Sequence, residues 1–284
     1  MHIIFNELSV YPLASDGIEV VRRFRLLLET FKSARSRYLA SHVLFPQNFG
    51  VGKISTAETF NQWLSALEDR TMKATLLSVY RRPFIDDLED GDADFFLGND
   101  FSMNEPGAPT NISPVGLPFA AIKKVPAISL KSAIFWEQRK FVLRLFSTVT
   151  LEDKRLIAYN LCNSDDPDSP ELQEWELDFL HRTLDSIDLL IRFLNFNRYS
   201  ARFEKGFFTE LLYWKSNDRE IFKSILELMK DVELNPFVGG FGKTERLKNS
   251  ELCSKRITQG ERLTYNVKSD TVTFVSCRGH YGEH

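Results

Sequence analysis

The chain has few cysteines and no long apolar segment. Its three cysteines, Cys162, Cys253 and Cys277, are odd in number and widely spaced. This argues against a disulfide framework or a zinc ribbon and suits a reducing compartment. No apolar run approaches the roughly 18 residues that a membrane span needs, and residues 1–7 lack the basic and apolar regions of a signal peptide. We therefore expect a cytoplasmic protein that does not contact a membrane.

The chain also lacks a strong excess of one charge. Its formal net charge is -3, so the whole chain is not a basic nucleic-acid binder. Residues 205–284 carry 13 Lys and Arg against 11 Asp and Glu, whereas the remainder carries 23 against 28. This modest C-terminal bias offers a polyanion a place to dock.

No motif for a cofactor or a metal stands out. The acidic segment 86–92 lacks the downstream Glu of a calcium loop. The glycine-rich segment 239–244 follows a predicted helix and lacks the spacing of a phosphate-binding loop. We expect no cofactor and no metal, and we expect Cys277 to be a small core residue of the last strand.

Residues 1–196 predict a mixed α+β domain. A strand is expected over 3–10, an amphipathic helix over 17–36 and another strand over 141–147. Between 172 and 196 the apolar residues recur at a spacing of 3.6, which predicts one long helix that closes this domain. These patterns do not indicate the function of residues 1–196, which we interpret as a regulatory, sensor or targeting domain.

Residues 197–284 predict a second, smaller α+β domain with an antiparallel sheet. A short strand at 201–203 precedes two helices, and Pro236 ends the second of them. Three strand-like runs close the chain, at 253–258, 261–267 and 271–277. The predicted order is β-α-α-β-β-β.

Six short fragments in this domain occur in a recognisable order. They are LLYW (211–214), NPF (235–237), GKTERLK (242–248), SKRIT (254–258), ERLTY (261–265) and CRGHY (277–281). In this set and order the domain resembles the YoeB/Txe branch of the RelE/ParE toxin superfamily. The resemblance implies a ribosome-associated messenger-RNA endonuclease that an antitoxin neutralises. The motif positions that would carry catalysis are Glu245, Arg262, His280 and Tyr281, and those that would contact phosphate are Lys248, Arg256, Lys243 and Arg278.

RNA can be cut without a metal because its 2′-OH serves as the nucleophile. In this scheme Glu245 is the base and His280 is the acid. Arg262 and Arg256 neutralise the phosphate oxygens, and Tyr281 stacks on a base or donates its hydroxyl. The expected products are a 2′,3′-cyclic phosphate and a 5′-hydroxyl, and EDTA should not inhibit.

The sequence departs from the family in three places. The segment between Lys248 and Ser254 is shorter, Gly260 replaces a common acidic residue, and the tail 282–284 follows Tyr281. The first hypothesis is therefore an endoribonuclease used in growth arrest or phage defence and controlled by residues 1–196. The alternatives are a catalytically inactive RelE-fold module that binds RNA, the ribosome or a protein partner, and a main activity in the N-terminal domain. An antitoxin, a phage protein and a homodimer stay open as partners.

Overall fold

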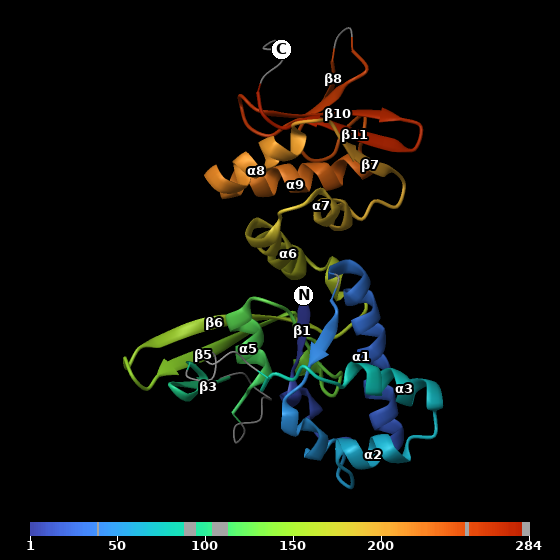
Figure 1. Ribbon diagram of the computed structural model, residues 1–284, viewed down its shortest axis with the longest axis vertical. Helices are drawn as coiled ribbons and strands as arrows, with labels where there is room; N and C mark the ends of the chain where they lie inside the picture. The colour runs from blue at the N-terminus through green and yellow to red at the C-terminus, as the bar shows by residue number, and fades with distance from the viewer. Residues whose placement is uncertain (39, 88–94, 104–112, 248–249, 280–284) are drawn as a thin grey trace. The chain divides into compact units, whose positions relative to one another are not determined.

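The chain folds into two compact units, Met1–Trp175 and Glu176–His284 (Figure 1). The computed structural model describes all residues except 39, 88–94, 104–112, 248–249 and 280–284. The division falls inside helix α6 (Pro170–Thr183) and precedes the predicted boundary at 196/197. The reason for the difference is that the apolar residues between 177 and 194 join the core of the second unit.

The first unit contains a six-stranded mixed sheet in the order β2-β1-β4-β6-β5-β3. Four neighbouring strands run parallel: β2 (His42–Leu44), β1 (His2–Phe5), β4 (Ala127–Ile128) and β6 (Asp153–Leu161). Antiparallel pairing then adds β5 (Lys140–Ser147) and β3 (Asn99–Ser102). The strand predicted over 3–10 is shorter, because the chain turns into a 3-10 helix at Glu7–Val10.

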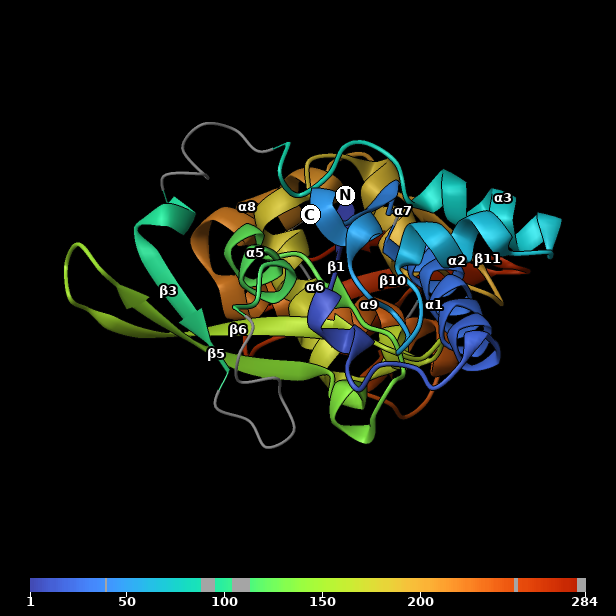
Figure 2. The same cartoon turned by 90° about the horizontal axis from the view of Figure 1, so that it is seen from below.

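Aromatic side chains pack helices of the first unit against one another. The Phe24 ring of α1 (Gly17–Tyr38) packs on Phe60 and Trp63 of α2 (Phe60–Ala66), with centroids 5.3 and 5.1 Å away. This unit also contains α3 (Arg70–Val79) and α5 (Gly116–Lys123). Figure 2 shows α1, α2 and α3 gathered at one side of the unit while β3, β5 and β6 extend to the other.

The second unit contains a five-stranded sheet in the order β7-β11-β10-β9-β8. Its strands are β7 (Ser200–Phe203), β8 (Thr244–Arg246), β9 (Cys253–Arg256), β10 (Arg262–Lys268) and β11 (Thr271–Ser276). The α+β class is confirmed. Two details differ from the prediction: β7 pairs parallel to β11, and β8 was not expected.

Helices α7 (Ile187–Leu194), α8 (Phe207–Asn217) and α9 (Arg219–Leu234) supply the rest of this unit's core. The single helix predicted over 172–196 is wrong, because α6 ends at Thr183 and Ser186 starts α7 by capping Leu189 N at 3.4 Å. Asp178 of α6 ties the pair to α9 through Arg219 and Lys223, each at 2.6 Å. Throughout the described ranges, no helix is long and apolar enough to cross a membrane.

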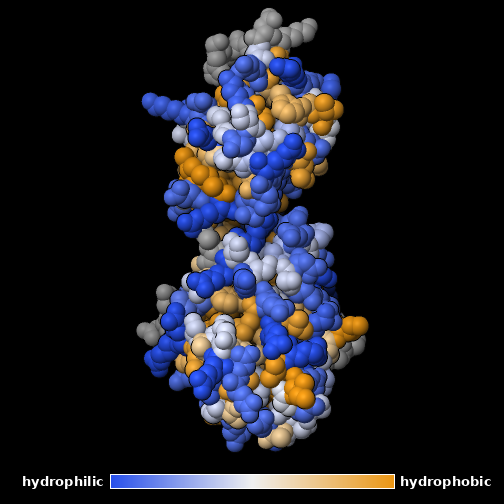
Figure 3. Space-filling view, turned by 90° about the vertical axis from the view of Figure 1, so that its right-hand side faces the viewer, coloured by the Kyte–Doolittle hydropathy of each residue, from blue (hydrophilic) through white to orange (hydrophobic). Residues whose placement is uncertain are grey.

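The surface of the protein is largely hydrophilic on the face in Figure 3, where apolar side chains form small scattered groups. Each unit instead buries its apolar residues inside. In the second unit Phe222 and Met229 of α9 share one cluster with Leu263 and Phe274 of the sheet. This burial supplies most of the favourable free energy of folding.

One charged side chain is completely buried in the second unit. The Lys255 side chain is 0% exposed, and its Nζ donates to Asp231 Oδ2 at 2.6 Å. Thr244 Oγ1, Gly239 O and Phe241 O lie 2.9, 3.2 and 3.3 Å from the same Nζ, whose three protons are shared among the four acceptors. The ammonium group thus gathers helix α9, the loop 239–242 and the start of β8 around one point.

The loop around this ammonium requires glycine. Gly240 has φ +72°, and a Cβ there would lie 2.2 Å from Asp231 Oδ2. Phe241 N donates to the same carboxylate at 2.9 Å. The backbone can approach this closely because Gly240 has no side chain.

Replacing Asp231 by Asn should leave the Lys255 ammonium buried without its counter-charge. We expect the free energy of unfolding of the second unit to fall by about 3–5 kcal/mol. Hydrogen exchange of the amides in 253–268 under increasing urea would measure it. The control is Glu251→Gln, which removes an ion pair exposed by 68% on both sides and should change the stability little, because exposed ion pairs are screened by solvent. Equal losses in the two variants would contradict the prediction.

Candidate functional site

Three of the predicted site residues lie on one face of the second sheet. Glu245 pairs with Ser254 across β8 and β9, and Ser254 pairs with Thr264 across β9 and β10. Arg256 and Arg262 form the next directly paired position on that face. The alternating residues, including Lys255, point to the other face, where the helices pack. The strand register therefore brings one carboxylate and two guanidinium groups together.

The two arginines form a pair of like charges. Directly opposed residues on antiparallel strands have Cβ atoms roughly 4.5–5.5 Å apart, and like charges there are destabilising. Arg262 is 7% exposed and its Nη1 donates to Thr258 O at 3.2 Å, whereas Arg256 is exposed. Within the described ranges, neither forms an ion pair with a carboxylate. The pair is therefore a place where an anion would be stabilised.

Glu245 is ionised at neutral pH. Its Oε1 lies 2.8 Å from Lys243 Nζ, and its side chain is 36% exposed. The hydrogen bond and the charge of Lys243 lower the pKa of Glu245, and the charges of Arg262 and Arg256 act in the same direction. Lys243, which was predicted to contact phosphate, thus contacts the carboxylate. Its assignment to phosphate stays a prediction.

Two carboxylates hold the last described residues. Glu210 Oε2 on α8 accepts hydrogen bonds from Cys277 N and Ser276 Oγ, both at 2.8 Å. Glu261, the neighbour of Arg262, accepts a hydrogen bond from Gly279 N. The chain thus reaches the start of β10 just before the predicted acid. His280 and Tyr281 themselves lie outside the described residues, as do Lys248 and the tail 282–284.

Arg278 and Cys277 have defined surroundings. The Arg278 guanidinium carbon lies 3.8 Å from the centroid of the Tyr213 ring on α8, a cation–π contact. Cys277 is 0% exposed, and burial followed by the charges of Glu210 and Glu261 raises the pKa of its thiol well above the ordinary value. The expected core role of Cys277 is confirmed. Among the residues with described positions, no group of three His, Cys, Asp or Glu could hold a metal ion.

Sequence reasoning missed the residues that position the site. Glu210 and Glu261 anchor the chain before His280, and Asp231 holds Lys255. Only Lys255 carried a usable signal. It alternates with Ser254 and Arg256 on a strand, so it had to face either the core or the site.

Helices α8 and α9 pack against one face of a small sheet, and acid and arginine side chains lie on the other face. This arrangement defines a small α+β domain of the RelE/ParE toxin type. Residues 203–281 match the family described as the YoeB-like toxin of bacterial type II toxin-antitoxin systems. The chain belongs to this family through its C-terminal domain, and the match begins after the first 202 residues.

Two curated relatives, Toxin YoeB and Toxin RelK, agree with this assignment. Toxin YoeB of Escherichia coli (strain K12) is 45% identical over 74 residues, which cover 25% of this chain and 87% of that protein. Toxin RelK of Mycobacterium tuberculosis (strain H37Rv) is 33% identical over 84 residues, covering 29% and 98%. Among solved structures, the YoeB dimer from Staphylococcus aureus is 33% identical, covers 30% of this chain and 100% of that chain, and has a TM-score of 0.29.

Removing Lys243 should raise the pKa of Glu245, because the nearest positive charge that favours its ionised form is lost. Carbon-13 NMR titration of the Glu245 carboxyl in Lys243→Ala would measure this. Lys268→Ala, which removes a lysine paired with Glu251 instead, should leave the Glu245 titration unchanged. An unaltered titration in Lys243→Ala would show that Lys243 does not hold this carboxylate.

Proposed function

We propose that the C-terminal domain is a metal-independent endoribonuclease toxin that cleaves messenger RNA, with the ribosome as its place of action. The observation that carries the proposal is the meeting of Glu245, Arg256 and Arg262 on one sheet face from three separate strands. The family motifs that contain these residues suggest the reaction. The strand register places the three side chains on a face where one phosphodiester can contact all of them.

The proposed reaction begins at the 2′-OH of the RNA. The Glu245 carboxylate takes the hydroxyl proton as the 2′-oxygen attacks phosphorus, and a pentavalent phosphorane forms. His280 then gives a proton to the departing 5′-oxygen as the P–O bond breaks. The products are a 2′,3′-cyclic phosphate and a 5′-hydroxyl, and Tyr281 orients a base by stacking. The lowered pKa of Glu245 keeps it ready to accept a proton but makes it a weak base.

The paired arginines fit the charge that develops during this reaction. Without a ligand, Arg256 and Arg262 repel each other across β9 and β10. A phosphate between them relieves the repulsion, and the phosphorane carries more negative charge than the ground state. Because the strand register places the two arginines opposite each other beforehand, their attraction for the transition state needs little backbone rearrangement.

We also infer an antitoxin partner and regulation by the first unit. YoeB from Staphylococcus aureus has been solved in a heterotetrameric YoeB-YefM toxin-antitoxin complex and as a dimer. By this similarity we infer that the chain binds an antitoxin in the cytoplasm. The same similarity supports a homodimer as a second assembly. The first unit then controls when RNA is cut, in growth arrest or in phage defence.

Glu245→Gln should reduce cleavage by about 10²–10⁴-fold, because the amide cannot accept the 2′-OH proton. Single-turnover cleavage of RNA by the full chain, with and without ribosomes and in the presence of EDTA, would measure the rate and the cyclic-phosphate ends. The matched control is Glu251→Gln, an exposed carboxylate paired with Lys268, which should keep the wild-type rate.

Three outcomes would contradict parts of this proposal. Equal rates for Glu245→Gln and wild type would remove Glu245 from the reaction. Inhibition of the wild type by EDTA would reject the metal-independent mechanism. RNA binding without cyclic-phosphate ends, on and off the ribosome, would replace the enzyme by the inactive binding module.

Arg256→Ala should weaken RNA binding in a salt-dependent manner. Each lost phosphate contact lowers the slope of log K against log salt by about 0.7 for a single strand. Fluorescence anisotropy with a single-stranded RNA between low and high salt would measure the slope. Arg246→Ala is the control, because Arg246 shares the strand of Glu245 but alternates to the other face. An unchanged slope in Arg256→Ala would mean that Arg256 does not contact phosphate.

A further inference from the structure

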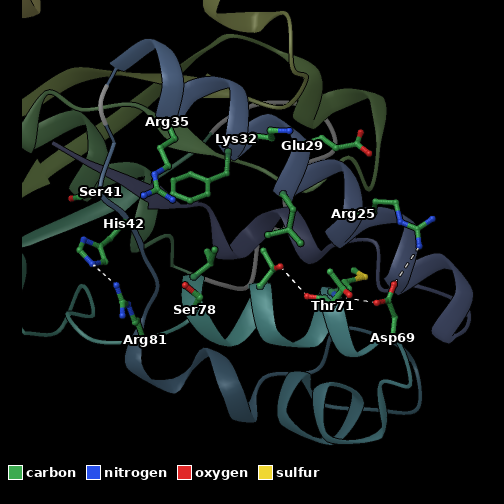
Figure 4. A pocket seen from close by; sticks show the side chains of 15 residues that line it. Arg25, Glu29, Lys32, Arg35, Ser41, His42, Asp69, Thr71, Ser78 and Arg81 are labelled. Carbon is green, nitrogen blue, oxygen red and sulfur yellow. Dashed lines mark hydrogen bonds and ion pairs between the residues drawn. The ribbon is translucent and has the colours of Figure 1, made fainter.

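A cavity lies between α1 and α3 in the first unit, far along the sequence from the toxin-type domain. Its volume is about 510 Å³, within the range of small-molecule sites. All of its lining residues belong to the first unit, and they come from α1, from α3 and its flanking residues Asp69 and Arg81, and from Ser41 and His42 at the start of β2. Figure 4 shows these side chains from close by.

Positive charge gathers at one end of this cavity. Arg35 of α1 and Arg81, which follows α3, lie there with Ser41 and His42 (Figure 4). Lys32 lines the cavity one helical turn before Arg35. In the part of the chain that the structure describes, neither Lys32 nor Arg35 has a carboxylate within ion-pair distance. Glu29 also lines the cavity and lies beside Lys32 in Figure 4, so it is the end at Arg35 and Arg81 that has no carboxylate among the lining residues.

His42 holds Arg81 in place without neutralising it. Arg81 Nη2 lies 3.3 Å from His42 Nε2. A guanidinium has only donors, so in this contact Arg81 donates and Nε2 accepts. Nδ1 is buried and has no hydrogen-bond partner among the described residues. The guanidinium keeps its full charge and its remaining donors for a ligand.

The rest of the cavity has a different chemistry. Its inner wall contains the buried side chains of Phe31, Met72 and Val79. Thr71, Thr75 and Ser78 add hydroxyl groups along α3. At the far end an ion pair joins α1 to the start of α3, where Arg25 Nη2 lies 4.0 Å from Asp69 Oδ2 (Figure 4).

We propose that this cavity binds a nucleoside phosphate. Two guanidinium groups and a lysine match a phosphate dianion better than a single carboxylate, because each guanidinium can give two parallel hydrogen bonds to phosphate oxygens. The apolar wall accepts a planar base, and the hydroxyl groups accept and donate to a ribose and to base edges. An acidic helix would instead need unpaired cations along the whole groove, whereas here Arg25 at the far end faces Asp69. Among the described residues, the lining cations without a carboxylate partner are Lys32, Arg35 and Arg81.

The test is calorimetric titration of the full chain with the four nucleoside 5′-monophosphates and the matching diphosphates. Inorganic phosphate and the free nucleosides serve as reference ligands. We expect at least one nucleotide to bind tighter than both of its parts. The variant Arg35→Ala/Arg81→Ala should weaken it by roughly tenfold or more for each guanidinium. This binding does not depend on RNA cleavage, so it can hold when the proposed nuclease activity fails.

Matched variants keep the result interpretable. Arg22→Ala/Arg70→Ala removes one arginine of α1 and one at the start of α3, neither of which lines the cavity, and should bind like wild type. Thr75→Trp should block binding while leaving every cation in place. The proposal is overturned by no heat with any nucleotide, by affinity no better than inorganic phosphate, or by equal affinity in the Arg35/Arg81 variant. Tighter binding of a 5′-phosphorylated RNA oligonucleotide at the same site would reassign the cavity to an RNA end.

Discussion

The second unit depends on one buried ion pair. Lys255 sits in the middle of β9 with its ammonium group enclosed, and Asp231 on α9 supplies the only full negative charge that the described residues place on it. The same ammonium binds two loop carbonyls and the hydroxyl of Thr244. Because Thr244 directly precedes Glu245, the buried charge determines where the candidate base lies. The contact that stabilises this unit therefore also positions the candidate base.

Much of the second unit could be predicted from the sequence, but not its shortest strand. Strands β9, β10 and β11 lie where alternation and β-favouring residues indicated them. Strand β8 has three residues and no apolar alternation, and it is held by Lys255 and by pairing with β9. The break between α6 and α7 was missed because apolar spacing continues past Thr183, and only the cap at Ser186 marks the new start.

The identity of the site residues came from the order of six fragments, and no composition argument would have selected them. Strand register then accounts for the shared face of Glu245, Arg256 and Arg262. The contacts of Lys243 and Arg278 could not be predicted, since they depend on how a loop and the chain end return to the sheet. In the first unit, two helices line the cavity, and no sequence motif predicts how these helices pack.

The break after α6 also changes what an intact toxin-type domain is. The family match begins at residue 203, yet the core of this unit includes apolar side chains of α6 and α7, among them Leu180, Leu190 and Phe193. A protease that cut between α7 and β7 would release a fragment that lacks this part of its core. Liberation of a stable fragment would require scission upstream of Glu176. The toxin-type domain of this chain therefore includes α7 and the second half of α6 in its own core.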